Sequence, residues 1–309
     1  MSVITPEEIT EGGLNVPIHA CDLYPQFAPS RAPGAARYRH TLPGGQHLDA
    51  LLVNKTSDVL VVCFHGALDR DKNTLPRFER LRTVNGMAVS AMYVGDPTLW
   101  MDDRMRLSWY VGWPEFDAQG VIADWAVRAA QAVGASHIIF TGSSGGGFAA
   151  LQVSALVPNS LALPFNPQTM IYQYRPHGKF WFQRSLMRAA WPNLAPEGVD
   201  KFDFSTDWTA QADDRMSAVR RYAQPVPNFT RFVINRNEDH YEGHYVPWLE
   251  AAHAGGNRNR VEGIVYEGGT IHGPPAPRVF NQHLQEALEY VQELPPVDTV
   301  NEPPVSYHP

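Results

Sequence analysis

The feature that most constrains this chain is a glycine-rich run at residues 140–148, which contains the pattern G-x-S-x-G. The residues before it, 136–140, are apolar and β-branched, which is typical of a buried parallel strand. The residues after it, 147–153, combine helix-forming content with an apolar face. The run therefore predicts a strand, a sharp turn and a helix, with Ser144 at the turn.

The glycines explain why this turn suits a reactive serine. A hydroxyl is held clear of the backbone on a sharp strand-to-helix turn only where the flanking residues lack bulky side chains. Gly142, Gly145 and Gly146 satisfy that requirement. A phosphate-binding Walker loop is excluded, because no lysine follows the glycines. Ser144 is therefore the candidate nucleophile.

Two backbone N–H donors should stabilise the oxyanion of a tetrahedral intermediate. One is expected from Gly145, the residue after the candidate nucleophile. The second should follow an earlier core strand, and residues 59–64 form a continuous apolar run that ends in a His-Gly pair. Ala67 or Leu68, just beyond that pair, is predicted to supply the second N–H. The histidine of the pair is interpreted as a residue that shapes the loop.

The general base should follow the nucleophile near the end of the chain. Residues 261–266 are expected to form the last strand, and the Gly-rich segment 267–274 the loop beyond it. His272 lies in this loop, ahead of a helix expected at 277–293. It is the only one of the 12 histidines with this context, so it is the predicted base.

The acid that orients the base should lie just past the penultimate strand, expected at residues 229–235. Three carboxylates crowd the following loop. Asp239 is the leading candidate, because Asp is the commoner acid in such triads and this position clears the strand end. Glu238 is the second candidate and Glu242 the third. The nearby segment 240–244 matches neither H-E-x-x-H nor H-x-x-E-H, so a zinc site is not predicted.

Together, the serine elbow, the His-Gly loop, the acidic loop and His272 resemble the α/β-hydrolase superfamily over residues 38–293. The resemblance implies an α/β fold with a mostly parallel central sheet flanked by helices, and no metal or organic cofactor. Three further phrases resemble a poorly characterised bacterial and phage group near the serine esterases and acyltransferases of accessory glycan secretion: Asp96-Pro97-Thr98-Leu99, Ser108-Trp109-Tyr110-Val111-Gly112 and Asn166-Pro167-Gln168-Thr169.

In the family, the serine is acylated by an ester and freed by water or another acceptor. The resemblance implies these roles for Ser144, His272 and Asp239. The expected activity is cleavage of a carboxylic ester, with an acyl or acetyl ester on a cell-surface glycan or a lipid as a candidate substrate. The alternatives are an O-acyltransferase acting on a glycan, a peptidase, and a glycan-binding phage tail component that does not cleave its ligand.

The 309 residues are expected to form one catalytic domain at 37–294, with an N-terminal arm at 1–36 and an extended tail at 295–309. A helical cap insertion is expected at about 170–227. Its aromatic residues interleave with arginine and lysine, so they either form platforms for a sugar or acyl group or pack the cap onto the sheet. Asp96 is either a substrate contact or a turn residue before proline.

Composition limits the partners and the compartment. A net charge of −7 without concentrated Lys and Arg excludes a general nucleic-acid partner. The two cysteines form no disulfide framework, and the sequence has neither a transmembrane-length apolar run nor a signal-peptide pattern. The cytoplasm is therefore the expected location, with a phage virion as the alternative. The expected partner is a small-molecule, glycan or lipid ester, and the oligomeric state stays open.

Overall fold

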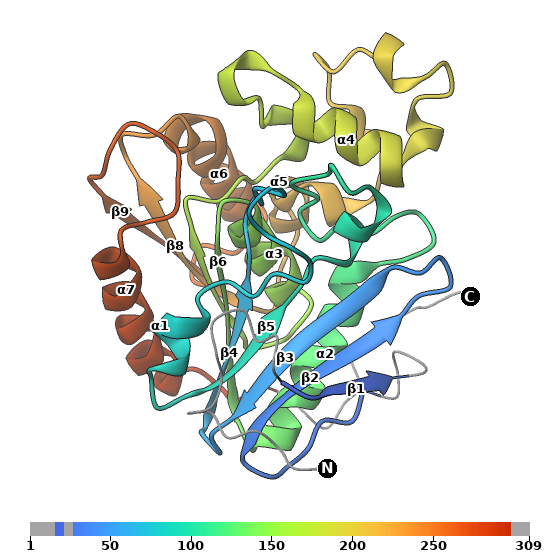
Figure 1. Cartoon of the computed structure of the whole chain (residues 1–309). Coiled ribbons are helices and arrows are strands. Elements are labelled where there is room, and N and C mark those ends of the chain that lie inside the picture. Colours follow the sequence, from blue (N-terminus) through green and yellow to red (C-terminus); the bar gives the residue numbers. More distant parts are fainter. Residues whose placement is uncertain (1–15, 22–26, 298–309) are drawn as a thin grey trace.

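The chain folds around a twisted nine-stranded sheet with helices on both faces, as the computed structural model in Figure 1 shows. The structure describes residues 16–21 and 27–297. The strand order is β1-β2-β3-β5-β4-β6-β7-β8-β9. The strands are β1 (Ile18–Cys21), β2 (Gly34–Thr41), β3 (His47–Asn54), β4 (Val59–Phe64), β5 (Ser90–Val94), β6 (His137–Ser143), β7 (Leu161–Phe165), β8 (Phe229–Asn235) and β9 (Val261–Tyr266).

From β5 to β9 in this order, every neighbouring pair of strands is parallel. β3 pairs antiparallel with both β2 and β5, and β1 adds a parallel edge strand on β2. The predicted mostly parallel sheet flanked by helices is therefore confirmed. Its parallel part brings the carboxyl ends of β4, β6, β7, β8 and β9 to one edge.

Alternation along the central strands explains why both faces are covered. In β4, Leu60, Val62 and Phe64 pack on one side, in the hydrophobic cluster that includes α2 and α3. Val61 and Cys63 pack on the other side with apolar residues of α1 and α7. The helices are α1 (Leu81–Asn85), α2 (Ala118–Val133), α3 (Gly145–Ser154), α4 (Trp181–Ala190), α5 (Ala218–Tyr222), α6 (Val246–Ala254) and α7 (Pro277–Tyr290).

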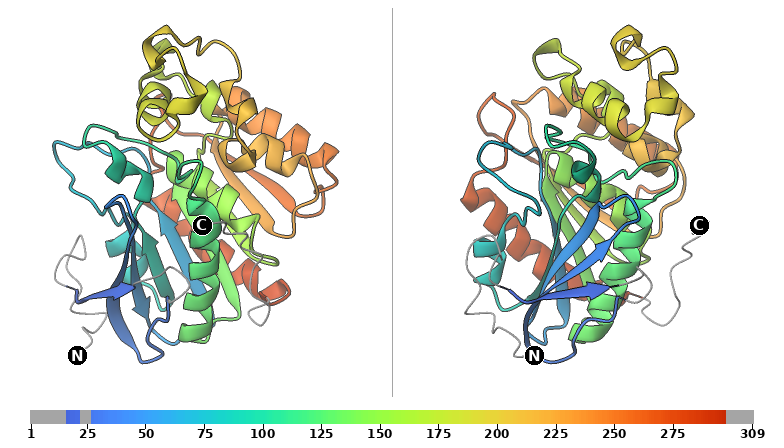
Figure 2. Two further views of the ribbon diagram at one scale, coloured as in Figure 1. Left: turned by 90° about the vertical axis from the view of Figure 1, so that its right-hand side faces the viewer. Right: turned by 45° about the vertical axis from the view of Figure 1, so that its right-hand side comes forward.

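The segment expected to form the cap contains α4, α5 and several short 3-10 turns. Its α4 part stands above the rest of the molecule in Figures 1 and 2. Within the segment expected to be the N-terminal arm, the described residues include β1 and the start of β2. Residues 1–15 and 22–26 of that arm, and 298–309 of the expected tail, lie outside the described part of the chain.

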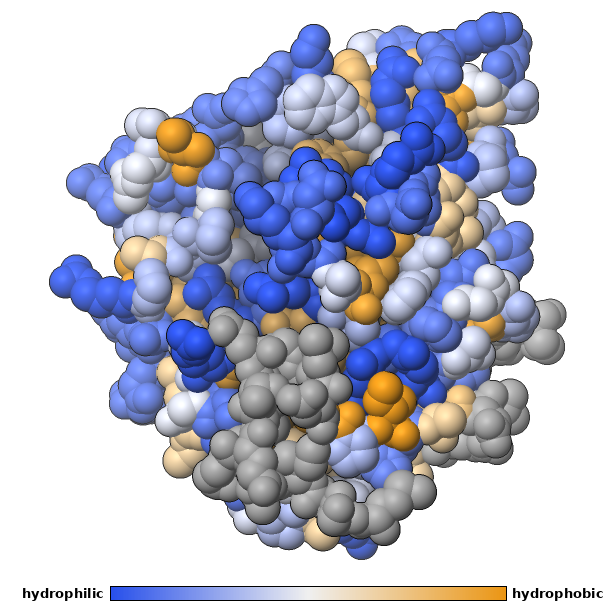
Figure 3. Space-filling model, viewed as in Figure 1, coloured by the Kyte–Doolittle hydropathy of each residue, from blue (hydrophilic) through white to orange (hydrophobic). Residues whose placement is uncertain are grey.

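On the face shown in Figure 3, the coloured residues are mainly hydrophilic, with scattered hydrophobic residues. The large exposed hydrophobic side chains of the described residues are Ile18, Trp181, Val265 and Ile271. None of the helices in the described part of the chain is both long and apolar enough to cross a bilayer.

The turn between β6 and α3 is built as the glycine pattern requires. Ser144 has φ 56° and ψ −119°, a conformation that L-residues rarely adopt. A Cβ on Gly142 would lie 2.5 Å from the Gly146 carbonyl group, and a Cβ on Gly146 would lie 2.5 Å from the Phe64 carbonyl oxygen. The start of α3 therefore packs directly on the backbone of β4, and only glycine fits there.

Replacing Gly146 with alanine should lower the free energy of unfolding by at least about 2 kcal/mol, because the new methyl group overlaps fixed backbone atoms. Gly86→Ala is the matched control, since Gly86 has φ −74° and its Cβ would meet its nearest neighbour at an ordinary 3.4 Å. Urea unfolding measures both variants. Equal stabilities would contradict the tight packing of α3 on β4.

Candidate functional site

Ser144 lies where β6 meets α3, and its hydroxyl is held by two side chains from other loops. Its Oγ is 2.9 Å from Nε2 of His272 and 2.8 Å from the side-chain nitrogen of Gln168. The structure thus brings the predicted nucleophile and the predicted base into hydrogen-bond contact. They are 128 positions apart in the sequence.

The other ring nitrogen of His272, Nδ1, is 2.7 Å from Oε2 of Glu238. The Glu238 side chain is only 3 % exposed. Because an ionised carboxylate only accepts hydrogen bonds, Nδ1 carries the proton and Nε2 presents its lone pair to the Ser144 hydroxyl. This is the tautomer that a general base requires.

Two asparagine amides hold the second carboxylate oxygen of Glu238. Asn235, at the end of β8, and Asn166, just after β7, each donate to Oε1 over 3.1 Å. Asn166 also donates to the Tyr266 hydroxyl and to the Gly273 carbonyl, so it ties the acid to the loop that carries the base. Donors at both oxygens fix the orientation of this buried carboxylate.

The placement of the three acidic candidates differs from the leading expectation. Asp239 and Glu242 are exposed, whereas Glu238, the second candidate, contacts the base. The physical reason is the turn after β8, in which the Tyr241 N–H donates to the Glu238 carbonyl. In this tight turn the third residue past the strand points back over the sheet edge and the fourth points to solvent. The geometry therefore favours Glu238 over Asp239 as the acid.

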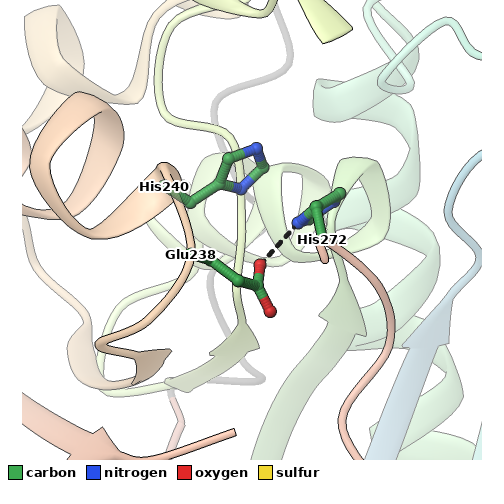
Figure 4. A group of neighbouring side chains, drawn as sticks. All are labelled: Glu238, His240 and His272. Carbon is green, nitrogen blue, oxygen red and sulfur yellow. Dashed lines mark hydrogen bonds and ion pairs between the residues drawn. The ribbon is translucent and has the colours of Figure 1, made fainter. Parts of the chain in front are cut away.

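His240 lies against His272, with ring centroids 3.9 Å apart, and the two side chains flank Glu238 (Figure 4). One potential ligand atom from each of these three residues lies within 4.8 Å of the other two, close enough to hold a metal ion. However, both nitrogens of His272 already bond to Ser144 and Glu238. A metal bound through His272 would therefore compete with one of those hydrogen bonds.

The predicted oxyanion donors differ in their availability. Gly145 is the first residue of α3, where helical N–H groups have no partner within the helix. The Leu68 N–H, in contrast, donates to the Arg106 carbonyl over 2.7 Å. Ala67 is exposed, and none of the hydrogen bonds among the described residues uses its N–H. Ala67 is thus better placed than Leu68 to serve with Gly145.

The His-Gly pair and Asp96 form a buried support beneath this loop. The His65 Nε2 accepts the Asp96 N–H over 3.2 Å, and burial lowers the pKa of His65 to about 4. The Asp96 carboxylate accepts from the Ser108 hydroxyl and from the Tyr110 N–H. Asp96 is only 1 % exposed, so its placement favours the turn-residue interpretation over a substrate contact.

A cavity of about 630 Å³ opens beside His272. Aromatic, cationic and imidazole side chains share its wall with small loop residues. The lining consists of Gln173, Tyr174, Arg175, Pro176, His177, Trp181, Phe182, Asp239, His240, Gly243, His244, Thr270, Ile271 and His272. Tyr174 comes from the expected cap and makes an edge contact with the His272 ring, at a centroid distance of 6.2 Å. The cap segment therefore contributes to the wall of the site.

Sequence reasoning missed Gln168 and Asn166 as site residues. Both follow β7, the strand next to the serine-bearing β6, and both are fully buried. The available signal was their position, since polar residues just past a core parallel strand lie at the edge where ligands bind. Their partners come from distant loops, which a linear pattern does not reveal.

Two buried histidines beside the base stay neutral. Burial, reinforced by the neighbouring His244 and His272, lowers the pKa of His240 well below its usual value. Burial, with a smaller contribution from His272, lowers the pKa of His244 to about 3. The neutral His244 accepts the Thr169 N–H at Nδ1 over 3.2 Å, which a protonated ring could not do.

The protein should lose stability as the pH falls below about 6.5, where these histidines gain protons in the unfolded chain but not in the folded one. Between pH 7 and pH 5 the free energy of unfolding should fall by about 2–4 kcal/mol. His244→Asn should shrink this fall by roughly 1–2 kcal/mol, because one such proton is removed. Urea titrations at both pH values measure the effect.

His253→Asn, on the partly exposed face of α6, is the matched control for this experiment. It should leave the fall between pH 7 and pH 5 unchanged. The same fall in wild type and His244→Asn would show that this buried imidazole does not set the acid limit.

No protein-family model matches this chain, and no curated protein matches it in sequence. Solved structures resemble it at low identity. A chain of the Glycosylation Associate Protein (Gap123) complex from Streptococcus agalactiae aligns with a TM-score of 0.57 and 16% identity, over 82% of this chain and 46% of that one. This chain thus spans less than half of that protein.

Carboxyl esterase 2 from the mycorrhizal fungus Tuber melanosporum aligns with a TM-score of 0.55 and 16% identity, over 83% of this chain and 87% of that one. Esterase B from Lactobacillus rhamnosis aligns at 0.53 and 12% identity, over 85% and 88%. These similarities, with the mostly parallel nine-stranded sheet, show that the chain has the α/β-hydrolase fold.

Proposed function

We propose that this protein is a serine hydrolase that cleaves a carboxylic ester through an acyl-enzyme. The observation that carries the proposal is the continuous line of hydrogen bonds from Ser144 through His272 to Glu238, with distances of 2.9 and 2.7 Å. The esterases among the structural neighbours support ester hydrolysis in general.

The reaction starts when Ser144 Oγ attacks the carbonyl carbon of the ester. His272 Nε2 takes the hydroxyl proton as the C–O bond forms, and the carbonyl electron pair moves onto oxygen. The tetrahedral intermediate then collapses, and His272 returns the proton to the departing alcohol. Water repeats these steps against the acyl-enzyme, releasing the carboxylic acid and restoring the Ser144 hydroxyl.

Glu238 keeps the His272 ring in the correct tautomer and stabilises the imidazolium that forms during each proton transfer. Its Oε1 is already satisfied by Asn166 and Asn235, so Oε2 is left for the ring. The neutral state of His240 matters here, since a charged ring whose centroid lies 3.9 Å from that of His272 would oppose the imidazolium.

The cavity beside His272 supports an ester carried on a polar, ring-shaped alcohol. Tyr174, Trp181 and Phe182 offer aromatic faces, and Arg175 and His177 offer hydrogen-bond donors at the same wall. Sugars present apolar ring faces and hydroxyl groups together, so this mixture suits an acylated carbohydrate. The likeness to a chain of a glycosylation-associated complex agrees with that substrate class.

O-acyl transfer to a glycan is the second candidate, because the cavity of about 630 Å³ beside His272 has room for an acceptor larger than water. The cavity is lined by the base itself, where an acceptor hydroxyl must come to lose its proton. Product analysis distinguishes the two: free carboxylic acid marks hydrolysis, whereas an acylated sugar formed at the expense of free acid marks transfer.

Ser144→Ala should abolish both the turnover of short-chain p-nitrophenyl esters and labelling by a fluorophosphonate. Glu238→Gln should lower kcat by about 10³- to 10⁴-fold, because the ring loses its orienting charge. Asp239→Asn should keep kcat for these small esters within about threefold of wild type, since Glu238, rather than the exposed Asp239, bonds to His272. Steady-state kinetics and peptide mapping of the label measure these effects.

Asp239→Asn is the matched control for Glu238→Gln, as both remove one carboxylate from the same loop. A large loss in Asp239→Asn with a normal Glu238→Gln would reverse the assignment of the acid. The absence of both turnover and labelling in the wild-type protein would rule out the hydrolase and the acyltransferase together.

Trp181→Ala should raise KM for an acetylated oligosaccharide about three- to tenfold while leaving kcat/KM for p-nitrophenyl acetate nearly unchanged. Trp181 is 59 % exposed at the cavity wall, where we expect it to contact the alcohol portion of a large ester. Trp100→Ala is the control, because Trp100 packs on His47 away from the cavity lining. Equal loss on both substrates would contradict a role in binding the alcohol portion.

A further inference from the structure

Gln168 makes two side-chain hydrogen bonds in the centre of the site. It is fully buried just past β7, its Nε2 lies 2.8 Å from Ser144 Oγ, and its Oε1 lies 3.1 Å from the indole Nε1 of Trp109. The amide therefore bridges the nucleophile and a tryptophan from a different loop. The proton transfers described above do not involve it.

The indole fixes which end of the Gln168 amide faces the serine. The oxygen and nitrogen of a glutamine amide are hard to distinguish by shape, but an indole N–H only donates. The Gln168 oxygen must therefore face Trp109, and the NH₂ group must face Ser144. Since this amide nitrogen donates, the single proton of the Ser144 hydroxyl points to His272 Nε2.

Trp109 is itself held in place by a strained loop. Trp109 and Tyr110 have φ values of 52° and 58°, which cost bulky residues of the order of 1–3 kcal/mol each. The buried Asp96 carboxylate accepts from Ser108 and Tyr110, and the Thr98 hydroxyl accepts from the Gly112 N–H over 3.0 Å. These bonds keep the indole aimed at Gln168.

The three phrases of sequence at 96–99, 108–112 and 166–169 thus meet in one network. Asp96 and Thr98 from the first phrase hold the second, whose Trp109 orients Gln168 from the third. Strained backbone of this kind persists only where many surrounding contacts hold it in place, and it is most common at functional sites. The network ends at the reacting oxygen of Ser144.

We propose that Gln168 is a catalytic residue that stabilises the negative charge developing on the substrate, with Trp109 as its positioning residue. The inference rests on the proposed acyl-transfer function. When Ser144 Oγ attacks, the substrate oxygen that gains the electron pair is bonded to the same carbon as Oγ. The Gln168 NH₂ group lies 2.8 Å from Oγ and has a second N–H, which would serve as a donor to that oxygen in addition to the N–H of Gly145 at the start of α3.

The state of the predicted backbone donors supports this role. Of the two donors predicted on the loop after β4, the Leu68 N–H is already bonded to the Arg106 carbonyl, and the Ala67 N–H is used by none of the hydrogen bonds among the described residues. The adjacent Gly66 N–H is bonded to the Glu79 carboxylate over 3.0 Å. A buried side-chain donor next to the nucleophile supplements what this loop offers. Removal of one such donor lowers kcat by about 10²- to 10³-fold.

The test compares three variants with wild type in p-nitrophenyl acetate hydrolysis and in the rate of fluorophosphonate labelling. Gln168→Met removes the donor and should lower kcat and the labelling rate about 10²- to 10³-fold, with KM within about threefold. Trp109→Phe keeps Gln168 but frees its orientation, and should lower kcat about tenfold. Circular dichroism and urea unfolding show whether each variant is folded.

The pH dependence of kcat in Gln168→Glu distinguishes hydrogen-bond donation by this side chain from a purely structural role. Gln168→Glu keeps an acceptor for Trp109 but presents a carboxylate to Ser144 at high pH and a donating carboxylic acid at low pH. Its kcat relative to wild type should therefore rise as the pH falls. This variant and Trp109→Phe keep the test decisive if Gln168→Met does not fold.

Two failures are distinguishable. If wild type labels at Ser144 and all three variants keep kcat within about threefold, the role of Gln168 is overturned and the proposed function stands. A pH-independent loss that tracks lost stability would also overturn it. If wild type neither hydrolyses esters nor labels, the proposed function fails and the role of Gln168 fails with it.

Discussion

The candidate site depends on the parallel pairing of four consecutive strands. Hydrogen bonds between β6, β7, β8 and β9 bring their carboxyl ends to one edge of the sheet. Each strand then delivers one polar group: Ser144 after β6, Gln168 after β7, Glu238 after β8 and His272 after β9. The backbone ladder, rather than contact between the side chains, brings these distant residues into register.

In the same arrangement, the Asn166 side chain connects the segments that carry Glu238 and His272. Its amide donates to Glu238, to the Tyr266 hydroxyl and to the Gly273 carbonyl, and its side-chain oxygen accepts the Asn235 N–H over 2.8 Å. One buried side chain thus joins the ends of β7, β8 and β9. Glu238 and His272 keep their spacing because both of their loops are anchored to Asn166.

The fold, and the candidate residues Ser144 and His272, could be predicted from the sequence because their signals are local. Apolar runs marked the core strands, and the steric demand at Gly142 and Gly146 marked the turn that carries Ser144. His272 followed from its place after the last strand. Asp239 was preferred to Glu238 because counting along the chain cannot tell how tightly it turns after β8. Gln168 was not predicted, because the orientation of its amide depends on a hydrogen bond from Trp109, 59 positions away in the sequence.

The fixed orientation of the Gln168 amide has a consequence for the electrostatics of the resting site. Trp109 donates to Gln168, Gln168 to Ser144, Ser144 to His272, and His272 to Glu238. Every dipole in this row points the same way and the row ends on an anion, so each bond polarises the next. Under the proposed mechanism, this row polarises the Ser144 hydroxyl before substrate binds, and the row needs no reorientation when the proton moves.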